Sequence, residues 1–352
     1  MTIALWQYVP LLHGSVMAVQ DYQLKRPSAW VGVDNFAEVL FDQNWWCAVY
    51  NSLRYSLLVL SLTFLPPIVL AVLLQEVPRG KLVFRTIYYL PAVITGIVTV
   101  LLWKLFYEPS ERGALNAVML KIPASGFLLV GLVLFGVAVA FARRLWLQHL
   151  RWTSWAFVGA GVLALVASGR MAAPILLLPG ESWAEAWPQM LSRLLARPAE
   201  PYRWLTDPST AMVACVIPMV WAGMGPGCLI YLAALRGIPD DFYEAADLDG
   251  ATFIDKILFV VFPTIRPLAI INFVGAFIAS WYASTGDILV MTGGGANTEV
   301  AGLYVWYKAF TFLKFGPATA AAWMLGSMLI GFTVHQLRIL ARVEFRTAGE
   351  KT

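Results

Sequence analysis

Few side chains in this sequence have the types and spacing that enzyme chemistry requires. The three histidines, His13, His149 and His335, are too scattered for a metal site, and there is no HExxH pair. The sequence also lacks GxxxxGK(S/T), so it does not encode a Walker-type phosphate loop. No nucleophile lies beside a recognisable base. We therefore predict no catalytic residue, no metal and no cofactor on this chain.

Acidic side chains gather in one stretch, 237–267, that is punctuated by glycine and proline. Pro239 suits the first position of a helix, where its missing N–H costs nothing. Asp240 and Asp241 would then lie in the first turn, where carboxylates complement the helix dipole. Gly250 is placed to end this helix in a left-handed turn.

A second short helix is expected directly after the first. Thr252 and Asp255 have a capping-box-like spacing at its start, and Pro263 and Pro267 are expected to break it. Such a helix pair suits docking into a groove of another protein, and resting on lipid headgroups is the alternative. Anionic lipids would repel the acidic side chains, whereas a basic groove would attract them. These side chains are Asp240, Asp241, Glu244, Asp247 and Asp249.

The composition indicates which elements must position these residues. Of the 352 residues, 59% are hydrophobic and only 13% are charged, and the mean hydropathy is +0.69. A soluble chain carries about 25% charged residues, so this one has too few polar side chains to cover a water-facing surface. Burial in a bilayer resolves this, because lipid-facing helices need no polar face. The net charge of +4 comes without a basic face with interleaved aromatics, which argues against nucleic-acid binding.

About eight apolar runs have the length of transmembrane helices, so the predicted fold is all-α and polytopic. The first run is short for a span, and we expect a helix that lacks part of its N-terminal end, with a cleaved signal as the alternative. If the N-terminus is cytoplasmic, the even-numbered connections and the C-terminal tail, which are basic, lie on that side, which predicts that both termini are cytoplasmic. The outward loops are less uniform and also carry Lys25, Arg26, Arg193, Arg197 and Arg203, which longer outward loops tolerate. The runs lie near 4–19, 52–75, 86–107, 127–142, 155–178, 211–235, 264–291 and 319–341.

The segment EAADLDGATFIDKILFVVFPTIRP, residues 244–267, resembles the EAA signature of ABC importer permeases. The matching positions are Glu244, Ala245, Ala246, Asp249, Gly250, Ala251, Pro263 and Pro267. The resemblance implies that this segment is a cytoplasmic coupling loop that docks on a nucleotide-binding subunit. Further segments resemble the maltose and glycerol-phosphate branch of these permeases: VGVDNF (31–36), NSLRYS (51–56), FRTIYYLPAVI (84–94), VMTGGGANTE (290–299) and FGPATAAA (315–322).

The resemblance implies the ABC type I importer fold and a permease subunit of an ATP-driven importer in the cell inner membrane. Its implied partners are a second homologous permease, two ATPase subunits that bind ATP and Mg, and an extracytoplasmic solute-binding protein. The implied cargo is a sugar or related polar solute. The chain then divides into three membrane helices at 1–120, an inserted helix pair with an outward loop at 121–200, core helices with the coupling loop at 201–341, and a cytoplasmic tail at 342–352.

Polar residues at membrane depth are candidates for the solute path. The seventh run carries Asn272, Trp281, Tyr282, Thr285 and Asp287, which combine the aromatic faces and hydrogen-bonding groups that suit a sugar. Helix–helix hydrogen bonds and interfacial anchoring are the alternative roles. Asp287 would instead suit an ion-coupled secondary transporter, the main rival function, whereas a membrane-embedded enzyme would need clustered ligands that the sequence lacks. The glycines at 293–295 that follow are expected to form a flexible outward loop.

Overall fold

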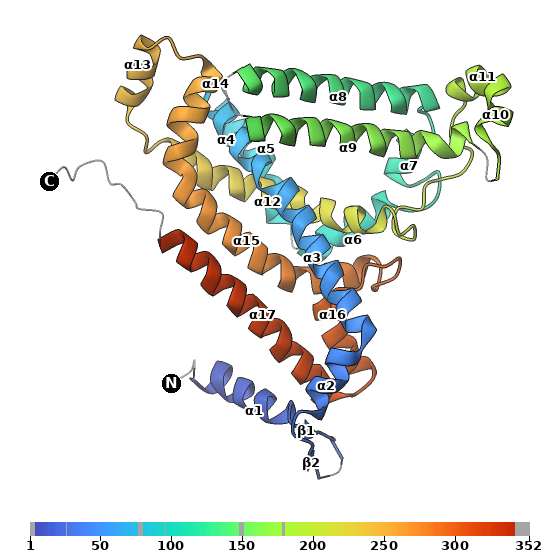
Figure 1. Cartoon of the computed structure of the whole chain (residues 1–352), viewed down its shortest axis with the longest axis vertical. Helices are drawn as coiled ribbons and strands as arrows, with labels where there is room; N and C mark the ends of the chain where they lie inside the picture. The colour runs from blue at the N-terminus through green and yellow to red at the C-terminus, as the bar shows by residue number, and fades with distance from the viewer. Residues whose placement is uncertain are drawn as a thin grey trace. The chain divides into compact units, whose positions relative to one another are not determined.

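The computed structural model describes residues 4–25, 27–76, 80–94, 96–147, 151–177 and 180–341, and the predicted tail at 342–352 lies outside them (Figure 1). Helices dominate this part of the chain, which confirms the predicted all-α class, and a single antiparallel hairpin of β1 (Gln20–Asp21) and β2 (Ala29–Trp30) is the only sheet in it. The chain forms two compact units, Met1–Trp103 with Leu205–Thr352, and Lys104–Trp204. The predicted insertion at 121–200 lies within the second unit.

The first unit contains most of the helices. From its N-terminal half come a π-helical turn (Ala4–Tyr8), α1 (Val9–Met17), α2 (Asp34–Phe41), α3 (Gln43–Thr63), α4 (Leu65–Glu76), α5 (Lys81–Val93) and most of α6 (Gly96–Phe106). From its C-terminal half come α12 (Ala211–Leu235), α13 (Asp240–Leu248), α14 (Phe253–Lys256), a π-helical turn (Ile257–Val261), α15 (Phe262–Met291), α16 (Ala301–Trp306), a second π-helical turn (Tyr307–Thr311) and α17 (Phe315–Ala341).

Within the described ranges, six helices are long and apolar enough to cross a membrane, and a bent pair would make a seventh. The bent pair joins Leu82–Val93 to Gly96–Phe106 at an angle of 94°. The sequence predicted about eight spans. The run that fails is the first, because its helical part ends at Met17 and is shorter than the roughly 20 residues that a bilayer requires. The six spans are Gln43–Gln75, Ala124–Leu147, Ser154–Leu176, Ala211–Leu235, Ile257–Met291 and Phe315–Gln336.

The span through α3 begins well before the apolar run that predicts it, which starts near residue 52. Asp42 explains the earlier start, because its side chain accepts the backbone N–H of Asn44 at 2.9 Å and caps the helix. In the first turns of α3, Gln43 and Asn44 are exposed, whereas Trp45 and Ala48 are buried. A local cap therefore moved the boundary that hydropathy alone suggested.

The second unit is built on a hairpin of two long helices, α8 (Ala124–Leu147) and α9 (Arg151–Leu176). Small residues bring their backbones close together, since a Cβ on Gly131 would lie 1.9 Å from the Ser168 hydroxyl and one on Gly161 would lie 2.9 Å from Cβ of Ala138. The shorter elements of this unit are α7 (Ala114–Met119), α10 (Trp183–Ala186), a 3₁₀ turn (Trp187–Gln189) and α11 (Met190–Leu195).

Candidate functional site: an acidic loop and a cavity between helices

Helix α13 is the most exposed helix of the acidic stretch 237–267. None of its residues is buried, and Phe242 and Leu248 are 51% and 90% exposed although both are large and apolar. Asp240 and Asp241 lie in its first turn, as predicted. Pro239 is the N-cap rather than the first helical residue, one position earlier than predicted. The helix thus presents carboxylates and two apolar side chains to its surroundings.

Gly250 ends α13 in the left-handed turn that the sequence predicts, with φ +72°. The Ala251 N–H donates to the Ala246 carbonyl at 2.9 Å, and the Gly250 N–H donates to the Asp247 carbonyl at 3.0 Å. These two bonds are those of a Schellman motif, which satisfies carbonyls that the helix end would otherwise leave without donors. The direction in which the chain leaves α13 is therefore fixed by backbone geometry.

The predicted capping box at the start of α14 is also confirmed. The Asp255 carboxylate accepts the Thr252 backbone N–H at 2.8 Å and the Thr252 hydroxyl at 2.6 Å, and the Asp255 N–H donates back to that hydroxyl oxygen at 3.4 Å. A salt bridge between Lys256 and Asp247 joins α14 to α13. The turn between the two short helices is thus hydrogen-bonded on both sides, and a salt bridge joins the helices to each other.

Pro263 and Pro267 were predicted to break the second short helix, but the structure shows that the helix continues through both prolines. The backbone stays helical from α14 into α15, and Pro267 lies inside α15. The π-helical turn at Ile257–Val261 precedes Pro263, and there the Phe262 N–H donates to the Ile257 carbonyl, five residues back. A π turn changes the hydrogen-bond register just before a residue that has no N–H, so the helix continues.

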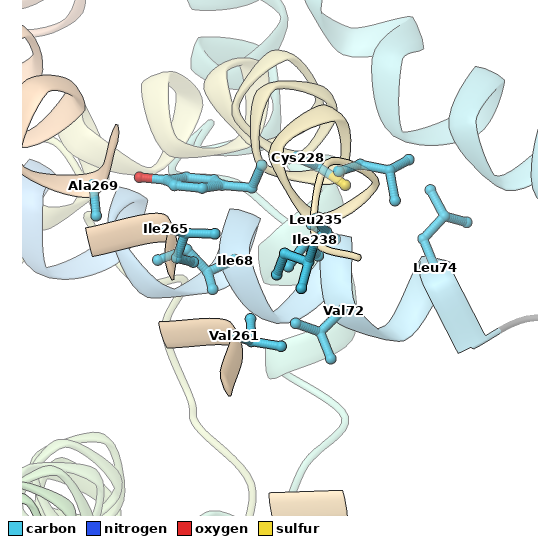
Figure 2. Close-up of a cluster of buried hydrophobic side chains, with 12 residues drawn as sticks. Ile68, Val72, Leu74, Cys228, Leu235, Ile238, Val261, Ile265 and Ala269 are labelled. Carbon is cyan, nitrogen blue, oxygen red and sulfur yellow. The ribbon is translucent and has the colours of Figure 1, made fainter. Parts of the chain in front are cut away.

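The acidic stretch is anchored in a buried apolar core, which Figure 2 shows. Ile238 enters the core before α13, and Val261 and Ile265 enter it after α14. They meet side chains of α4 and α12, so three long helices share one packed cluster with the two ends of the loop. Its remaining buried members are Ile68, Ala71, Val72, Leu74, Cys228, Tyr231, Leu232, Leu235 and Ala269. Packed interiors transmit displacement because they have few voids.

A cavity of about 310 Å³ lies farther along the same helices, between α3, α12 and α15. Asn272 contributes to its wall, as does Tyr55, whose hydroxyl donates to the Asp287 carboxylate at 3.3 Å. The remaining described lining is mainly small or apolar: Val59, Leu60, Thr63, Phe64, Pro67, Met219, Gly223, Gly227, Ile230, Tyr231, Ala276, Ala279, Ser280 and Ala283. The cavity therefore combines a few hydrogen-bonding groups with a largely apolar wall, as small-molecule sites do.

The other predicted path residues do not join this cavity. Trp281 is 8% exposed and packs on Phe277 in a second apolar core, whereas the neighbouring Tyr282 is 70% exposed on another side of α15. Thr285 faces α16, since a Cβ on Gly302 would lie 2.0 Å from the Thr285 hydroxyl. Of the five predicted residues, Asn272 lines the cavity and Asp287 lies one hydrogen bond from it.

Polar residues of α3 were missed as site candidates, although they belong to the segment 51–56. Asn51 donates to the Glu299 carbonyl at 3.0 Å, the Ser52 hydroxyl accepts the Ala301 N–H at 2.8 Å, and Ser56 and Ser280 share a hydrogen bond of 2.7 Å. The four polar side chains at 51, 52, 55 and 56 follow the i, i+1, i+4, i+5 spacing of one helix face. That spacing was the signal that could have identified them.

The glycine-rich segment after α15 is hydrogen-bonded rather than flexible. Thr292 and Thr298 share a hydroxyl–hydroxyl bond of 2.6 Å across it, and the Tyr307 hydroxyl donates to the Gly293 carbonyl at 2.8 Å. Ala296 and Asn297 have φ values of +52° and +57°, a left-handed geometry that costs a non-glycine residue energy. The surrounding bonds hold this geometry, so the segment has a defined shape.

A charged cluster lies beside this segment, at the start of α3. The Asp42 carboxylate accepts the Tyr304 hydroxyl at 2.7 Å and pairs with Lys308 at 3.1 Å. Burial alone would raise the pKa of Asp42, but the hydrogen bonds from Tyr304, Asn44 and Lys308 outweigh it and hold this pKa below its usual value. Burial and the charge of Asp42 raise the pKa of Glu299. The cluster borders an open hollow of about 710 Å³.

The segments that carry the sequence resemblance meet one another in the first unit. Asn35, in the segment 31–36, donates to the carbonyls of Ala18 and Gln20. Gly316, in the segment 315–322, packs so closely that a Cβ there would lie 2.5 Å from the Gln20 carbonyl. Gly225 of α12 approaches the segment 84–94, where a Cβ would lie 2.1 Å from the Tyr88 carbonyl. These segments thus occupy helix contacts that fix the arrangement of the bundle.

The fold and the site together define a multi-pass, all-α membrane protein with an exposed, double-capped acidic loop at one end of its longest helix. No family model matches the chain. Curated relatives match nearly all of it. The probable ABC transporter permease YesP of Bacillus subtilis is 22% identical over 322 residues, 90% of this chain and 79% of the relative. A probable ABC transporter permease of Pyrococcus horikoshii is 26% identical, with 93% and 88% covered. The sn-glycerol-3-phosphate transport system permease UgpA of Yersinia pestis is 22% identical, with 96% and 88% covered.

Solved structures agree with these relatives. A chain from a bacterial ABC transporter involved in the import of the acidic polysaccharide alginate superposes with a TM-score of 0.68 at 19% identity, covering 97% of this chain and 91% of that one. A chain from a bacterial alginate ABC transporter in complex with an alginate pentasaccharide-bound periplasmic protein superposes with a TM-score of 0.67. At this identity the likeness shows the fold. The predicted resemblance is confirmed: the chain is similar, over almost its whole length, to permease proteins of ABC transporters, including a glycerol-3-phosphate system and an alginate importer.

Proposed function

We propose that this chain is the permease subunit of an ATP-driven importer for a sugar or related polar solute. The observation that carries the proposal is the geometry of 237–267. Helix α13 has no buried residue, the turn after it is hydrogen-bonded on both sides, and the ends of the loop pack in a core shared by α4, α12 and α15. A segment with this shape can be pushed by another protein without deforming. The names and structures of the similar proteins support the choice of transporter class.

The partner that we propose for this loop is an ABC ATPase, which holds ATP and Mg on its own chain. The loop residues Glu244, Ala245, Ala246, Asp249, Gly250, Ala251 and Pro263 would form or shape the contact, with carboxylates toward a basic groove and Phe242 and Leu248 as apolar contacts. Closing of two ATPase subunits would displace α13, and the shared core would pass this displacement to the long helices. The helix bundle is the two-state element in this scheme.

We place the loop and both chain termini in the cytoplasm of a cell whose inner membrane the helices cross. A second, homologous permease would complete the solute path beside the cavity of α3, α12 and α15. An extracytoplasmic solute-binding protein would dock at the opposite end, near the charged cluster of Asp42 and Lys308 and its open hollow. One similar solved transporter is a complex with a periplasmic protein of this kind.

The test is purification of the tagged permease from its native membranes in mild detergent. We expect vanadate-sensitive, Mg-dependent ATP hydrolysis to co-elute with it. Glu244→Lys reverses a charge on the exposed helix and should remove this activity, whereas Glu111→Lys, an exposed acid of the second unit, should retain it. Retention of the activity in Glu244→Lys would contradict the docking role. Robust uptake in proteoliposomes without ATP would instead support the ion-coupled rival and overturn the proposal.

A further inference from the structure

Helix α15 lines the cavity with one stripe of side chains, and Asp287 continues this stripe. Asn272, Ala276, Ala279, Ser280 and Ala283 line the cavity at successive spacings of four, three, one and three residues, which place them on one face of the helix. Asp287 follows four residues after Ala283, one turn farther along the same face and toward the segment 292–298. A solute that moves between the cavity and this end of the bundle therefore meets a carboxylate next.

Tyr55 fixes the position of this carboxylate. Tyr55 is 1% exposed and forms part of the cavity wall, and its hydroxyl donates to Oδ2 of Asp287 at 3.3 Å. A phenol hydroxyl donates one hydrogen bond and leaves the remaining acceptor sites of the carboxylate unused. Such acceptor sites match the hydroxyl groups of a solute, which donate hydrogen bonds, and do not match an anion, which only accepts them.

No opposite charge balances Asp287 at the cavity. Among the described residues that line it, none is Lys or Arg. Arg54 is the neighbour of Tyr55 in sequence, but it lies about 100° around α3 from Tyr55, on the side away from Val59 and Thr63. Charge in a narrow site with apolar walls acts over a longer distance than in water. An anionic solute would thus meet repulsion at this end and find no cationic donor on the described wall.

We propose that Asp287 is a specificity-determining residue that gives the outer end of the path a negative charge, so that the carrier accepts uncharged polyhydroxyl solutes and excludes sugar acids and sugar phosphates. The inference rests on the proposed function, because it takes the cavity to be part of the solute path. It separates this chain from relatives whose names include an acidic polysaccharide or glycerol-3-phosphate.

The test measures local charge at the cavity without knowing the cargo. In the assembled transporter in right-side-out vesicles, Cys47, Cys215 and Cys228 are replaced, and Ala283→Cys supplies one thiol on the stripe. Rates of modification are compared for an anionic (sulfonatoethyl), a cationic (trimethylammonioethyl) and a neutral alkyl methanethiosulfonate. One turn from a carboxylate, at an effective dielectric constant of about 40, a unit charge changes the rate on the order of tenfold. Relative to the neutral reagent, the anion should be slowed and the cation accelerated.

Asp287→Asn in the same background should abolish most of this charge preference and leave the neutral rate unchanged. Asp34→Asn, an exposed acid of α2, is the matched control and should preserve the preference. Ala276→Cys, which lies about 16 Å from Asp287 along the helix, should show a weaker preference than Ala283→Cys. An anion-to-cation ratio that is the same with and without Asp287→Asn would overturn the inference while the solute path stands.

A different result would show that the cavity does not belong to the solute path. If the neutral reagent modifies neither Ala283→Cys nor Ala276→Cys, both in the absence of nucleotide and with ATP and vanadate, the cavity is not on a solute path. The charge-filter inference then falls with it. ATPase co-purification through the 237–267 loop would still stand, so the two failures are distinguishable.

Discussion

Gly250→Ala should loosen the acidic loop through the backbone alone. No atom lies within 4 Å of the Cβ that alanine would add, so the substitution creates no collision. The φ of +72° is the only obstacle, and left-handed geometry costs an L-residue about 1–2 kcal/mol. Since 1.4 kcal/mol is a factor of ten, opening of the Schellman turn should become about 5- to 30-fold more frequent. Asn tolerates this region better, so Gly250→Asn should have a smaller effect.

Hydrogen exchange measures this opening directly. The Ala251 amide donates to the Ala246 carbonyl at 2.9 Å, so its protection reports whether the turn is closed. We expect protection of this amide to fall by the factor above in Gly250→Ala and by less in Gly250→Asn. The affinity for the ATPase should fall by no more than the same factor, because docking requires the closed turn. Gly286→Ala is the matched control, since a Cβ there meets nothing and no positive φ is involved.

Equal protection in Gly250→Ala and the unsubstituted chain would refute the reasoning, because it would mean that the turn does not depend on a left-handed residue. Equal losses for Asn and Ala would also count against it. That pattern would point to a contact made by the added side chain rather than to backbone strain.

Three further outcomes are expected. Gly225→Ala should reduce the yield of folded protein and its thermal midpoint severely, since its Cβ would lie 2.1 Å from the Tyr88 carbonyl, whereas Gly223→Ala, with nothing within 4 Å, should fold normally by size-exclusion chromatography and thermal melting. Glu299→Gln should raise the thermal midpoint at pH 7, because the raised pKa of Glu299 means that its ionised form opposes folding, and this gain should vanish as pH falls below the raised pKa. Asp42→Asn should lower the midpoint at pH 7, with the difference lost below about pH 4, because a lowered pKa gives stability that is present above the unfolded-state value and disappears as pH falls through the folded-state value.

Local chemistry made the caps of the acidic loop predictable. The Gly250 turn and the Thr252–Asp255 box each join residues within five positions, so residue type and spacing suffice to place them. Pro267 was predicted wrongly for the same local reason. A sequence shows the missing N–H of a proline, but not whether a π turn upstream keeps the helix continuous.

Contacts between distant segments were not predictable from the sequence. The hydrogen bond from Tyr55 to Asp287 joins residues 232 positions apart, and nothing in either segment names the other. Trp281 and Tyr282 are adjacent, yet one is 8% and the other 70% exposed, because neighbours on a helix point about 100° apart. Only the packing of α15 against α3 and α17 decides which of the two is buried.

The unbroken helix from the acidic loop to the segment 292–298 has a mechanical consequence. Its membrane part, Ile257–Met291, has 35 residues and is therefore about 52 Å long. A helix of this length can act as a lever whose pivot is the packed core of Ile238, Val261 and Ile265, near its N-terminal end. A tilt of about 5° there swings the far end by roughly 4–5 Å. Under the proposed function, a small displacement of α13 by the ATPase would thus be amplified to several ångströms at the end of α15 near the segment 292–298.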